Sequence, residues 1–250
     1  MTRHVSVIVP AAGAGLRMGG DVRKQFRTLG DAPVLVQTLR AFDGHADIDA
    51  VTVVVPAEEV EPVRALLDAH ALATHASVVA GGATRQASVG RGLDAVVEQA
   101  TAELVLVHDG VRPFVGARAI AQVVEAARRD GAAALALAVA DTLRRGDGDT
   151  FGDTVPREGL WRMQTPQAFQ TALLAEAHAA AQRDGFAGTD EVALVQRLGH
   201  AVRIVPGSAF NVKLTRPSDW AYAEALWPVW SDRHARGGTM AQEPGSGFRS

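Results

Sequence analysis

The sequence predicts an α/β fold in which a mostly parallel sheet carries helices on both faces. Short apolar, β-branched runs alternate along the chain with segments whose apolar residues recur at helical spacing. Such alternation favours parallel strands joined by crossover helices. The 250 residues, 47% of them hydrophobic and 21% charged, suffice for one domain with a full core.

Buried strands are expected at five apolar runs, namely 5–9, 51–55, 78–80, 104–107 and 134–139. Between them, three segments are expected to form helices, because each places its apolar residues on one face. These faces comprise Val63, Leu66 and Leu67; Val89, Leu93, Val96 and Val97; and Ile120, Val123, Val124 and Ala127.

The regular alternation stops at 141–161, a polar stretch rich in Gly and Asp. At its centre, Gly146-Asp147-Gly148-Asp149 is a turn signal between strand-compatible residues. We therefore predict a protruding β-hairpin, here called the arm, with a flexible surface loop as the alternative.

Beyond the arm, apolar periodicity predicts helices at 171–183 and 191–198, and strands at 202–205 and about 211–214. A last helix is expected to begin near Pro217, since proline suits an early helical position. The tail at 231–250 has no periodicity and is expected to be disordered, which leaves 1–230 as the folded domain.

Composition argues against several classes of protein. The net charge of -3 gives no support for nucleic-acid binding. The lack of cysteine excludes disulfides, cysteine zinc sites and thiol catalysis, and fits a reducing compartment. No apolar run approaches the ~20 residues of a spanning helix, and Pro10 interrupts the N-terminal run too early for a signal peptide. We expect a cytoplasmic protein with neither a membrane nor a nucleic-acid partner.

The most informative segment is VIVPAAGAGLRMGG at 7–20, which RKQF follows at 23–26. Ligands of open parallel sheets bind at the carboxyl ends of strands, and a strand is expected to end at Pro10. Small residues there allow close backbone approach, and exposed amides hold phosphate oxygens. These small residues are Ala11, Ala12, Gly13, Ala14 and Gly15. With Arg17 and Lys24 as cations, the loop predicts a triphosphate site.

Two other phosphate-binding loops do not fit this segment. Met18 stands where the dinucleotide-binding fingerprint needs a third small residue, and no acidic residue closes a second strand about 20 residues later. No Gly-Lys-Ser/Thr ends the loop, as a P-loop requires. A nicotinamide oxidoreductase is therefore disfavoured.

A second glycine-containing motif, GGATRQASVGRGL at 81–93, lies between an expected strand and an expected helix. Gly82 again permits close backbone approach to a ligand, and Arg85 and Ser88 are placed to face one. A plain helix N-terminus is the alternative interpretation.

A third motif, LVHDGVRPF at 106–114, places Asp109 at the end of a central strand. One carboxylate there suits Mg²⁺ or a substrate hydroxyl, because Mg²⁺ takes few protein carboxylates and completes its shell with phosphate oxygens. Arg112 can reach a phosphate. His108 is expected to be structural, since nothing nearby completes a catalytic relay.

In sequence order, these motifs resemble those of nucleotidyltransferases, and of 2-C-methyl-D-erythritol 4-phosphate cytidylyltransferases in particular. The resemblance extends through QTPQAF at 164–169, TDE at 189–191 and NVKLTRPSD at 211–219, and covers about 5–227. Two positions depart from the family pattern. Leu16 stands where a second basic residue often occurs, and Ala83 where some members carry an acidic residue.

The resemblance implies a Rossmann-like catalytic domain that transfers CMP from CTP to 2-C-methyl-D-erythritol 4-phosphate, with Mg²⁺ or another divalent cation held partly by Asp109. It implies an arm that crosses to a second subunit in a homodimer. Beside the first loop, the implied nucleotide contacts are Gly82, Ala83, Arg85, Ser88 and Asp109. The implied acceptor contacts are Asp109, Gly110, Arg112, Thr142, Arg157, Thr165, Thr189 and Lys213. The implied catalytic cations are Arg17, Lys24, Lys213 and Arg157, the last reaching the site of the neighbouring subunit.

Three alternatives stay open at this point. The acceptor can be another polyol phosphate such as ribitol 5-phosphate, or the enzyme can join a sugar 1-phosphate to another nucleotide. A non-catalytic nucleotide sensor is a third class, since fold alone never establishes activity. The joint presence of the catalytic cations and Asp109 disfavours a sensor, which does not need all of them.

Overall fold

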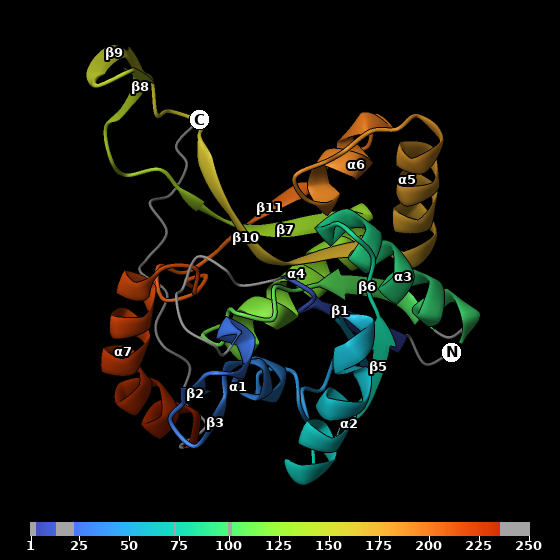
Figure 1. Cartoon of the computed structure of the whole chain (residues 1–250). Coiled ribbons are helices and arrows are strands. Elements are labelled where there is room, and N and C mark those ends of the chain that lie inside the picture. The colour runs from blue at the N-terminus through green and yellow to red at the C-terminus, as the bar shows by residue number, and fades with distance from the viewer. Residues whose placement is uncertain (1–3, 14–22, 73, 100–101, 236–250) are drawn as a thin grey trace.

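The computed structural model describes residues 4–13, 23–72, 74–99 and 102–235. Its centre is a seven-stranded sheet in the order β11-β7-β10-β6-β1-β4-β5 (Figure 1). Every neighbouring pair is parallel except the two pairs that β10 makes with β6 and β7. The strands are β1 (His4–Pro10), β4 (Ala50–Val55), β5 (His75–Ala80), β6 (Ala102–Val107), β7 (Ala132–Ala138), β10 (Trp161–Gln170) and β11 (Arg203–Pro206).

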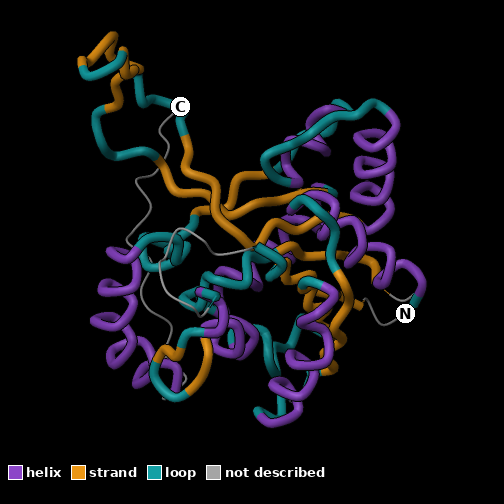
Figure 2. Tube along the Cα trace, viewed as in Figure 1, coloured by secondary structure: helices purple, strands orange, loops and turns teal. Residues whose placement is uncertain are grey.

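Helices cover both faces of this sheet, as Figure 2 shows with purple helices around orange strands. Alternate residues of a strand point to opposite faces, so Val7 and Ile8 of β1 belong to different core clusters. One cluster includes α1 (Val34–Arg40), α2 (Val60–Ala69) and α4 (Ala117–Asp130). The other includes α3 (Arg85–Glu98), α5 (Thr171–Arg183) and α6 (Glu191–Arg197).

The strand order changes direction between β1 and β6. From β1 the chain proceeds outward to β4 and β5, and then returns to place β6 on the other side of β1. Ligands of such sheets bind in the crevice outside the carboxyl ends of the strands at this switch point. Because Pro10 ends β1 and Val107 ends β6, the loops after these two residues flank the expected ligand site.

A third, smaller core cluster lies beside the sheet and includes α7 (Pro217–Ala235). Trp230 of α7 packs edge-on against Phe114, with the ring centroids 5.5 Å apart. The guanidinium of Arg27 lies over the ring of Trp220, 4.2 Å from its centroid. These contacts join α7 to the loop after β6, which carries Phe114, and to the chain that follows the first loop, which carries Arg27. The chain after the first loop contains the short helix η2 (Lys24–Phe26) and a hairpin of β2 (Thr28–Leu29) and β3 (Ala32–Pro33). Another short helix, η3 (Ala57–Glu59), lies directly before α2.

The predicted arm is present as a β-hairpin of β8 (Leu143–Asp147) and β9 (Thr150–Val155), paired antiparallel. It projects from the body of the protein beyond the C-terminal end of β7 (Figure 1). Gly148 has φ +56° in its turn, a conformation that glycine adopts without strain. Phe151 on the arm is 85% exposed in this single chain. The flexible-loop alternative is therefore wrong, whereas dimerisation through the arm stays a prediction.

The predicted α/β class and the five strands expected before the arm are confirmed, and so is the helix at 171–183. The predicted helix faces are buried as expected except at Val97, which is 46% exposed on α3, and Leu66, which is only partly buried. Within the described residues, no helix has the length and apolar character needed to cross a membrane.

The sequence did not predict β10, because Pro166 and several polar residues argue against a central strand there. A register shift between Met163 and Gln167 accommodates the proline within the ladder. The helix α1, the hairpin of β2 and β3 and both short helices were also not predicted.

Two predictions about the C-terminal part are wrong. No strand forms at 211–214, where hydrogen bonds to side chains replace a ladder: Asn211 O accepts from Arg112 at 2.7 Å, and the Asn211 side-chain amide donates to Thr165 O at 2.8 Å. The predicted disordered tail begins too early, since α7 continues through Ala235. The rest of that tail, 236–250, lies outside the described residues.

Gly92 gives a test of the packing of α3 on the sheet. A Cβ at this position would lie 2.7 Å from Ile8 Cγ2 and 2.8 Å from Val54 Cγ2, both in the core. Overpacking costs about 1–3 kcal/mol, more than the ~1 kcal/mol that alanine gains in helix propensity. We expect Gly92→Ala to lower the thermal unfolding midpoint by several degrees.

The matched control is Gly90→Ala on the same helix, where the nearest atom to an added Cβ is His178 Nδ1 at 3.5 Å. That variant should keep or raise the midpoint. Equal midpoints for both variants would contradict the close contact between α3 and the sheet.

Candidate active site

The loop after β1 is tied to both of its neighbours. Ala11 N donates to Val54 O at the end of β4 at 2.7 Å. The buried amide of Gln25 donates to Ala11 O at 2.9 Å, which fixes η2 and its first residue, Lys24, against the loop. The backbone of Ala11, the first residue of the loop, is therefore fixed by two hydrogen bonds to residues outside the loop. Ala14, Gly15 and Arg17 lie outside the described residues.

The loop after β5 is shaped by Ser88. Its hydroxyl contacts Gly82 N and Gly82 O at 3.2 Å and donates to Thr84 O at 2.9 Å. The Thr84 side chain caps α3 by accepting from Ala87 N at 3.0 Å. A Cβ on Gly81 would lie 2.8 Å from the Ser88 hydroxyl, so glycine permits this close approach. The first part of the predicted motif, 81–84, therefore forms a fixed loop beside the first one, and the rest of the motif begins α3.

A cavity of about 410 Å³ opens between these loops. It brings together most of the residues that the sequence predicts for the nucleotide and the reaction. Ala11, Ala12, Gly13, Lys24, Gly82, Ala83, Arg85, Ser88, Asp109, Gly110 and Lys213 line it.

A second cavity, of about 240 Å³, adjoins the first along shared residues. Arg85, Asp109 and Lys213 line both cavities, and Arg112, Thr165 and Thr189 line only the second. Two joined cavities suit two ligands whose reacting groups meet at the shared wall. The predicted acceptor residues fall in the second cavity, apart from Gly110, Thr142 and Arg157.

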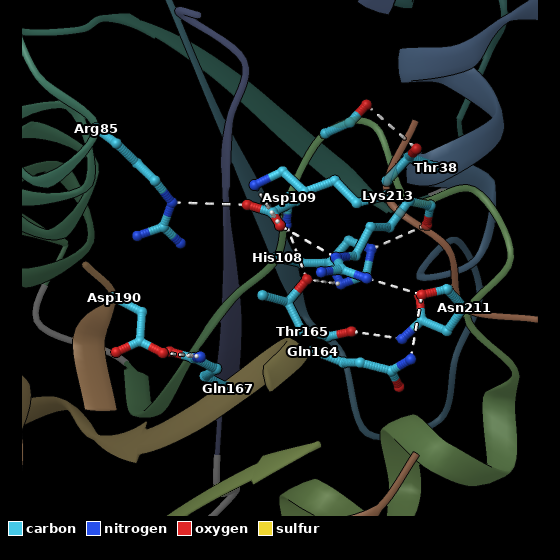
Figure 3. Close-up of polar contacts among 12 residues, drawn as sticks. Thr38, Arg85, His108, Asp109, Gln164, Thr165, Gln167, Asp190, Asn211 and Lys213 are labelled. Atoms are coloured by element: carbon cyan, nitrogen blue, oxygen red, sulfur yellow. Dashed lines mark hydrogen bonds and ion pairs between the residues drawn. The ribbon is translucent and has the colours of Figure 1, made fainter. Parts of the chain in front are cut away.

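Asp109 is the centre of the shared wall (Figure 3). Its Oδ2 accepts from Arg112 Nε at 3.1 Å and lies 3.1 Å from Lys213 Nζ. Its Oδ1 lies 3.6 Å from Arg85 Nε, outside hydrogen-bond distance. Burial alone would raise the pKa of the Asp109 carboxyl, but the charges of Lys213, Arg112 and Arg85 lower it well below its usual range. Asp109 is thus a carboxylate at any physiological pH.

His108 is buried, as its predicted structural role requires. Its Nε2 lies 3.1 Å from Arg112 O, and its Nδ1 lies 3.1 Å from the Thr165 hydroxyl, which also accepts from Asp109 N. Phe42 packs edge-on against the ring. Burial lowers the pKa of His108 to about 4, so the ring is neutral near pH 7. His108 connects β10 to the loop that carries Asp109 and Arg112.

Two predicted acceptor residues lie away from both cavities. Thr142 and Arg157 are exposed at the base of the arm, where Arg157 Nη1 donates to Ala140 O. This position agrees with a role toward a second subunit, which stays a prediction.

Sequence reasoning missed Glu191, which is 1% exposed at the start of α6. Arg85 Nη1 donates to both of its carboxylate oxygens at 2.9 Å. Burial raises the pKa of the Glu191 carboxyl, and the Arg85 charge opposes this. The only signal was the TDE motif at 189–191, in which Asp190 is the N-cap. Gln25 was also missed, although it belongs to the K-Q pair of the first motif.

Among the described residues, no group of three or more His, Asp or Glu side chains is arranged to hold a metal ion. The prediction that Asp109 is the single protein carboxylate of a divalent-cation site is neither supported nor contradicted by this finding. Its Oδ1 lies 3.6 Å from Arg85 Nε, outside hydrogen-bond distance, whereas Oδ2 accepts from Arg112 and lies 3.1 Å from Lys213 Nζ. This donor set fits a Mg²⁺ ion that takes most of its oxygen ligands from phosphates and water.

Residues 5–228 match the family described as "IspD: 2-C-methyl-D-erythritol 4-phosphate cytidylyltransferase". The chain belongs to this family. A 2-C-methyl-D-erythritol 4-phosphate cytidylyltransferase from Salinibacter ruber is 50% identical to it over 232 residues, which are 93% of this chain and 96% of the relative. One from Bacillus velezensis is 44% identical over 229 residues, covering 91% and 97%.

Solved structures of the family agree with the fold. The crystal structure of 2-C-methyl-D-erythritol 4-phosphate cytidylyltransferase from Thermus thermophilus superimposes with a TM-score of 0.77 at 44% identity, covering 90% of this chain and 99% of that one. The resemblance noted in the motifs is therefore confirmed as membership of the IspD family, and the chain spans nearly the full length of these relatives.

The buried neutral His108 predicts a pH dependence of stability. The unfolded chain, with a histidine pKa near 6.5, takes up a proton as the pH falls, whereas the native ring resists until about pH 4. Stability is therefore fully present above pH 6.5 and is lost as the pH falls toward 4. His108 should contribute a loss of about 2 kcal/mol between pH 8 and pH 5.

We expect His108→Gln to show a smaller loss than the wild type when urea unfolding is measured at both pH values. His178 remains in both proteins, and burial lowers its pKa to about 4 as well, so a residual dependence is expected. His200→Gln, at an exposed position, is the control and should match the wild type. An unchanged loss in His108→Gln would contradict the neutral buried ring.

Proposed function

We propose that this chain is the enzyme that transfers CMP from CTP to 2-C-methyl-D-erythritol 4-phosphate. The products are 4-diphosphocytidyl-2-C-methyl-D-erythritol and pyrophosphate, in the non-mevalonate synthesis of isoprenoid precursors. The observation that carries the proposal is the convergence of Lys213, Arg112 and Arg85 on Asp109 where two cavities meet. Family membership supports the substrates. The catalytic domain extends to the end of α7 at Ala235. The protein acts in the cytoplasm.

The reaction needs no general base. A phosphate monoester has its second pKa near 6 and is largely dianionic at pH 7. One of its oxygens forms the new bond to the α-phosphorus of CTP, while the bond from that phosphorus to the bridging oxygen of the β-phosphate breaks and pyrophosphate leaves. The work left to the protein is to align the two phosphates and to offset their charge.

The residues divide this work between the two cavities. Lys24, held by the contact of Gln25 with Ala11, faces the nucleotide cavity and stabilises the charge that develops on the triphosphate. Lys213 lines both cavities and orients the attacking phosphate toward it. Arg17, which lies outside the described residues, is assigned to the triphosphate on the sequence motif alone.

Asp109 would hold a divalent cation at the nucleotide site through its Oδ1, which neither Arg112 nor Lys213 contacts. When bound, Mg²⁺ offsets phosphate charge and holds the triphosphate in one conformation. Asp109 itself orients Arg112 and Lys213 whether or not the cation is present.

The arm supplies the remaining acceptor contacts in a homodimer. Arg157 and Thr142 lie at its base, away from the cavities of their own chain. Phe151, exposed in the single chain, offers apolar surface for a partner. Arg157 would thus contact the acceptor phosphate in the partner's site.

Product analysis tests the function directly. The wild type, incubated with Mg²⁺, CTP and 2-C-methyl-D-erythritol 4-phosphate, should release pyrophosphate and form the cytidine diphosphate adduct, identified by mass. Excess chelator should abolish release. Parallel reactions with UTP, ATP and GTP, and with ribitol 5-phosphate as acceptor, test the alternatives. Faster turnover with any of these, or no product with the expected pair, would overturn the assignment.

Mixed dimers test the shared site. Arg157→Ala and Lys24→Ala should each lose about 10²–10³-fold in kcat, because each removes a contact to developing charge. When the two variants are mixed and exchange subunits, half of the dimers are hybrids with one intact site. We expect the mixture to recover up to about one quarter of wild-type activity, by the additivity of independent sites.

The control mixes Lys24→Ala with Lys213→Ala, whose side chains line the same cavity of one chain. Every hybrid site then carries one defect, so no recovery is expected. If the Arg157 mixture also fails to recover while subunit exchange is shown by mass, Arg157 does not act across a dimer.

A further inference from the structure

Glu191 is a buried carboxylate at the end of the TDE motif and is not among the predicted substrate contacts. It is 1% exposed and is the first residue of α6. Its neighbour Asp190 caps the helix by accepting from Ala193 N at 3.0 Å, and accepts from Gln167 Nε2 at 2.9 Å. The start of α6 is thereby attached to β10, and the Glu191 carboxylate has a fixed position. A buried carboxylate is tolerated only where a cation or hydrogen bonds compensate it.

Arg85 is the cation that compensates Glu191. Both carboxylate oxygens accept from the same nitrogen, Nη1, at 2.9 Å. This contact joins α3 to α6, 106 positions apart in the chain. On the other side of the guanidinium, Nε faces Asp109 Oδ1 at 3.6 Å. Arg85 therefore stands between two carboxylates and is bonded to only one of them.

The position of Arg85 matters for both cavities, because its side chain lines each of them. Without Glu191, the nearest carboxylate for the guanidinium would be Asp109. A move of less than about 1 Å toward Asp109 would turn the 3.6 Å approach into a hydrogen bond of about 2.9 Å. Arg85 would then leave its present position in the wall of the cavities. It would also bind Asp109 Oδ1, the oxygen that faces neither Arg112 nor Lys213.

We infer that Glu191 is a positioning residue that holds Arg85 at the boundary of the two cavities and keeps it off Asp109. The inference rests on the proposed function in that CTP is the ligand of the first cavity. Glu191 itself lines neither cavity, so it acts through Arg85.

A double-mutant cycle with CTP as the probe tests this inference. Calorimetry in Mg²⁺ buffer, without acceptor, gives both the dissociation constant and the number of binding sites per chain. We expect Glu191→Gln and Arg85→Met each to weaken CTP binding about 10-fold. The first variant leaves the Arg85 guanidinium misplaced, and the second removes its charge. The double variant should bind no more than about twofold more weakly than Arg85→Met, because Glu191 has no effect once Arg85 is gone.

The control is Asp184→Asn, which breaks the exposed ion pair between Asp184 and Arg197 near the other end of α6. It should bind CTP as the wild type does. A purely structural role of Glu191 would lower the thermal midpoint and the number of sites per chain, while the dissociation constant of the folded fraction stayed unchanged. That result, or additive effects in the double variant, would overturn the inference.

The cycle is independent of product formation. A wild type that binds CTP and makes no product fails the proposed function, and the cycle still decides the role of Glu191. A wild type that binds no CTP overturns both.

Discussion

The buried carboxylate of Asp109 is the constraint on which the rest of the site depends. It is 6% exposed at the end of β6 and faces cations from three separate segments, carried by Arg85, Arg112 and Lys213. A carboxylate in that position would destabilise the fold if it were unpaired. The loop after β5, the turn after β6 and the irregular segment before α7 are therefore drawn to one point, which is the switch point of the sheet.

This arrangement gathers positive charge where the two cavities meet. Three cations, Arg85, Arg112 and Lys213, face the single carboxylate of Asp109. Lys24 lies on the wall of the first cavity. In a partly buried site such charge is worth more than in water, and it is already in position before a phosphate arrives. The contacts that stabilise the fold thus also prepare the site for an anionic ligand.

The sequence predicts a strand correctly where its local apolar pattern matches the burial of that strand in the folded protein. Inner parallel strands are buried on both faces, so runs such as 51–55 and 104–107 carry a clear apolar signal. That signal fails for β10, whose Pro166 is accommodated by a register shift that only the neighbouring strands define. It also fails at 211–214, where strand-like residues are held by Arg112 and Gln164 instead of a ladder.

The site divides in a similar way. The residues predicted to meet a ligand lie in short motifs at strand ends. Asp109, Lys24 and Gly82 were predicted from spacing and from resemblance, and all three line the first cavity. Glu191 had no comparable signal, because its partner Arg85 is 106 positions away and the two meet only once α3 and α6 have packed. Reaction chemistry dictates which groups must touch the phosphates and limits them to a few residue types. The groups that hold those side chains in place need only complementary charge at the right distance, which many positions can supply. Supporting residues are therefore set by tertiary structure, and for them geometry carries information that local sequence does not.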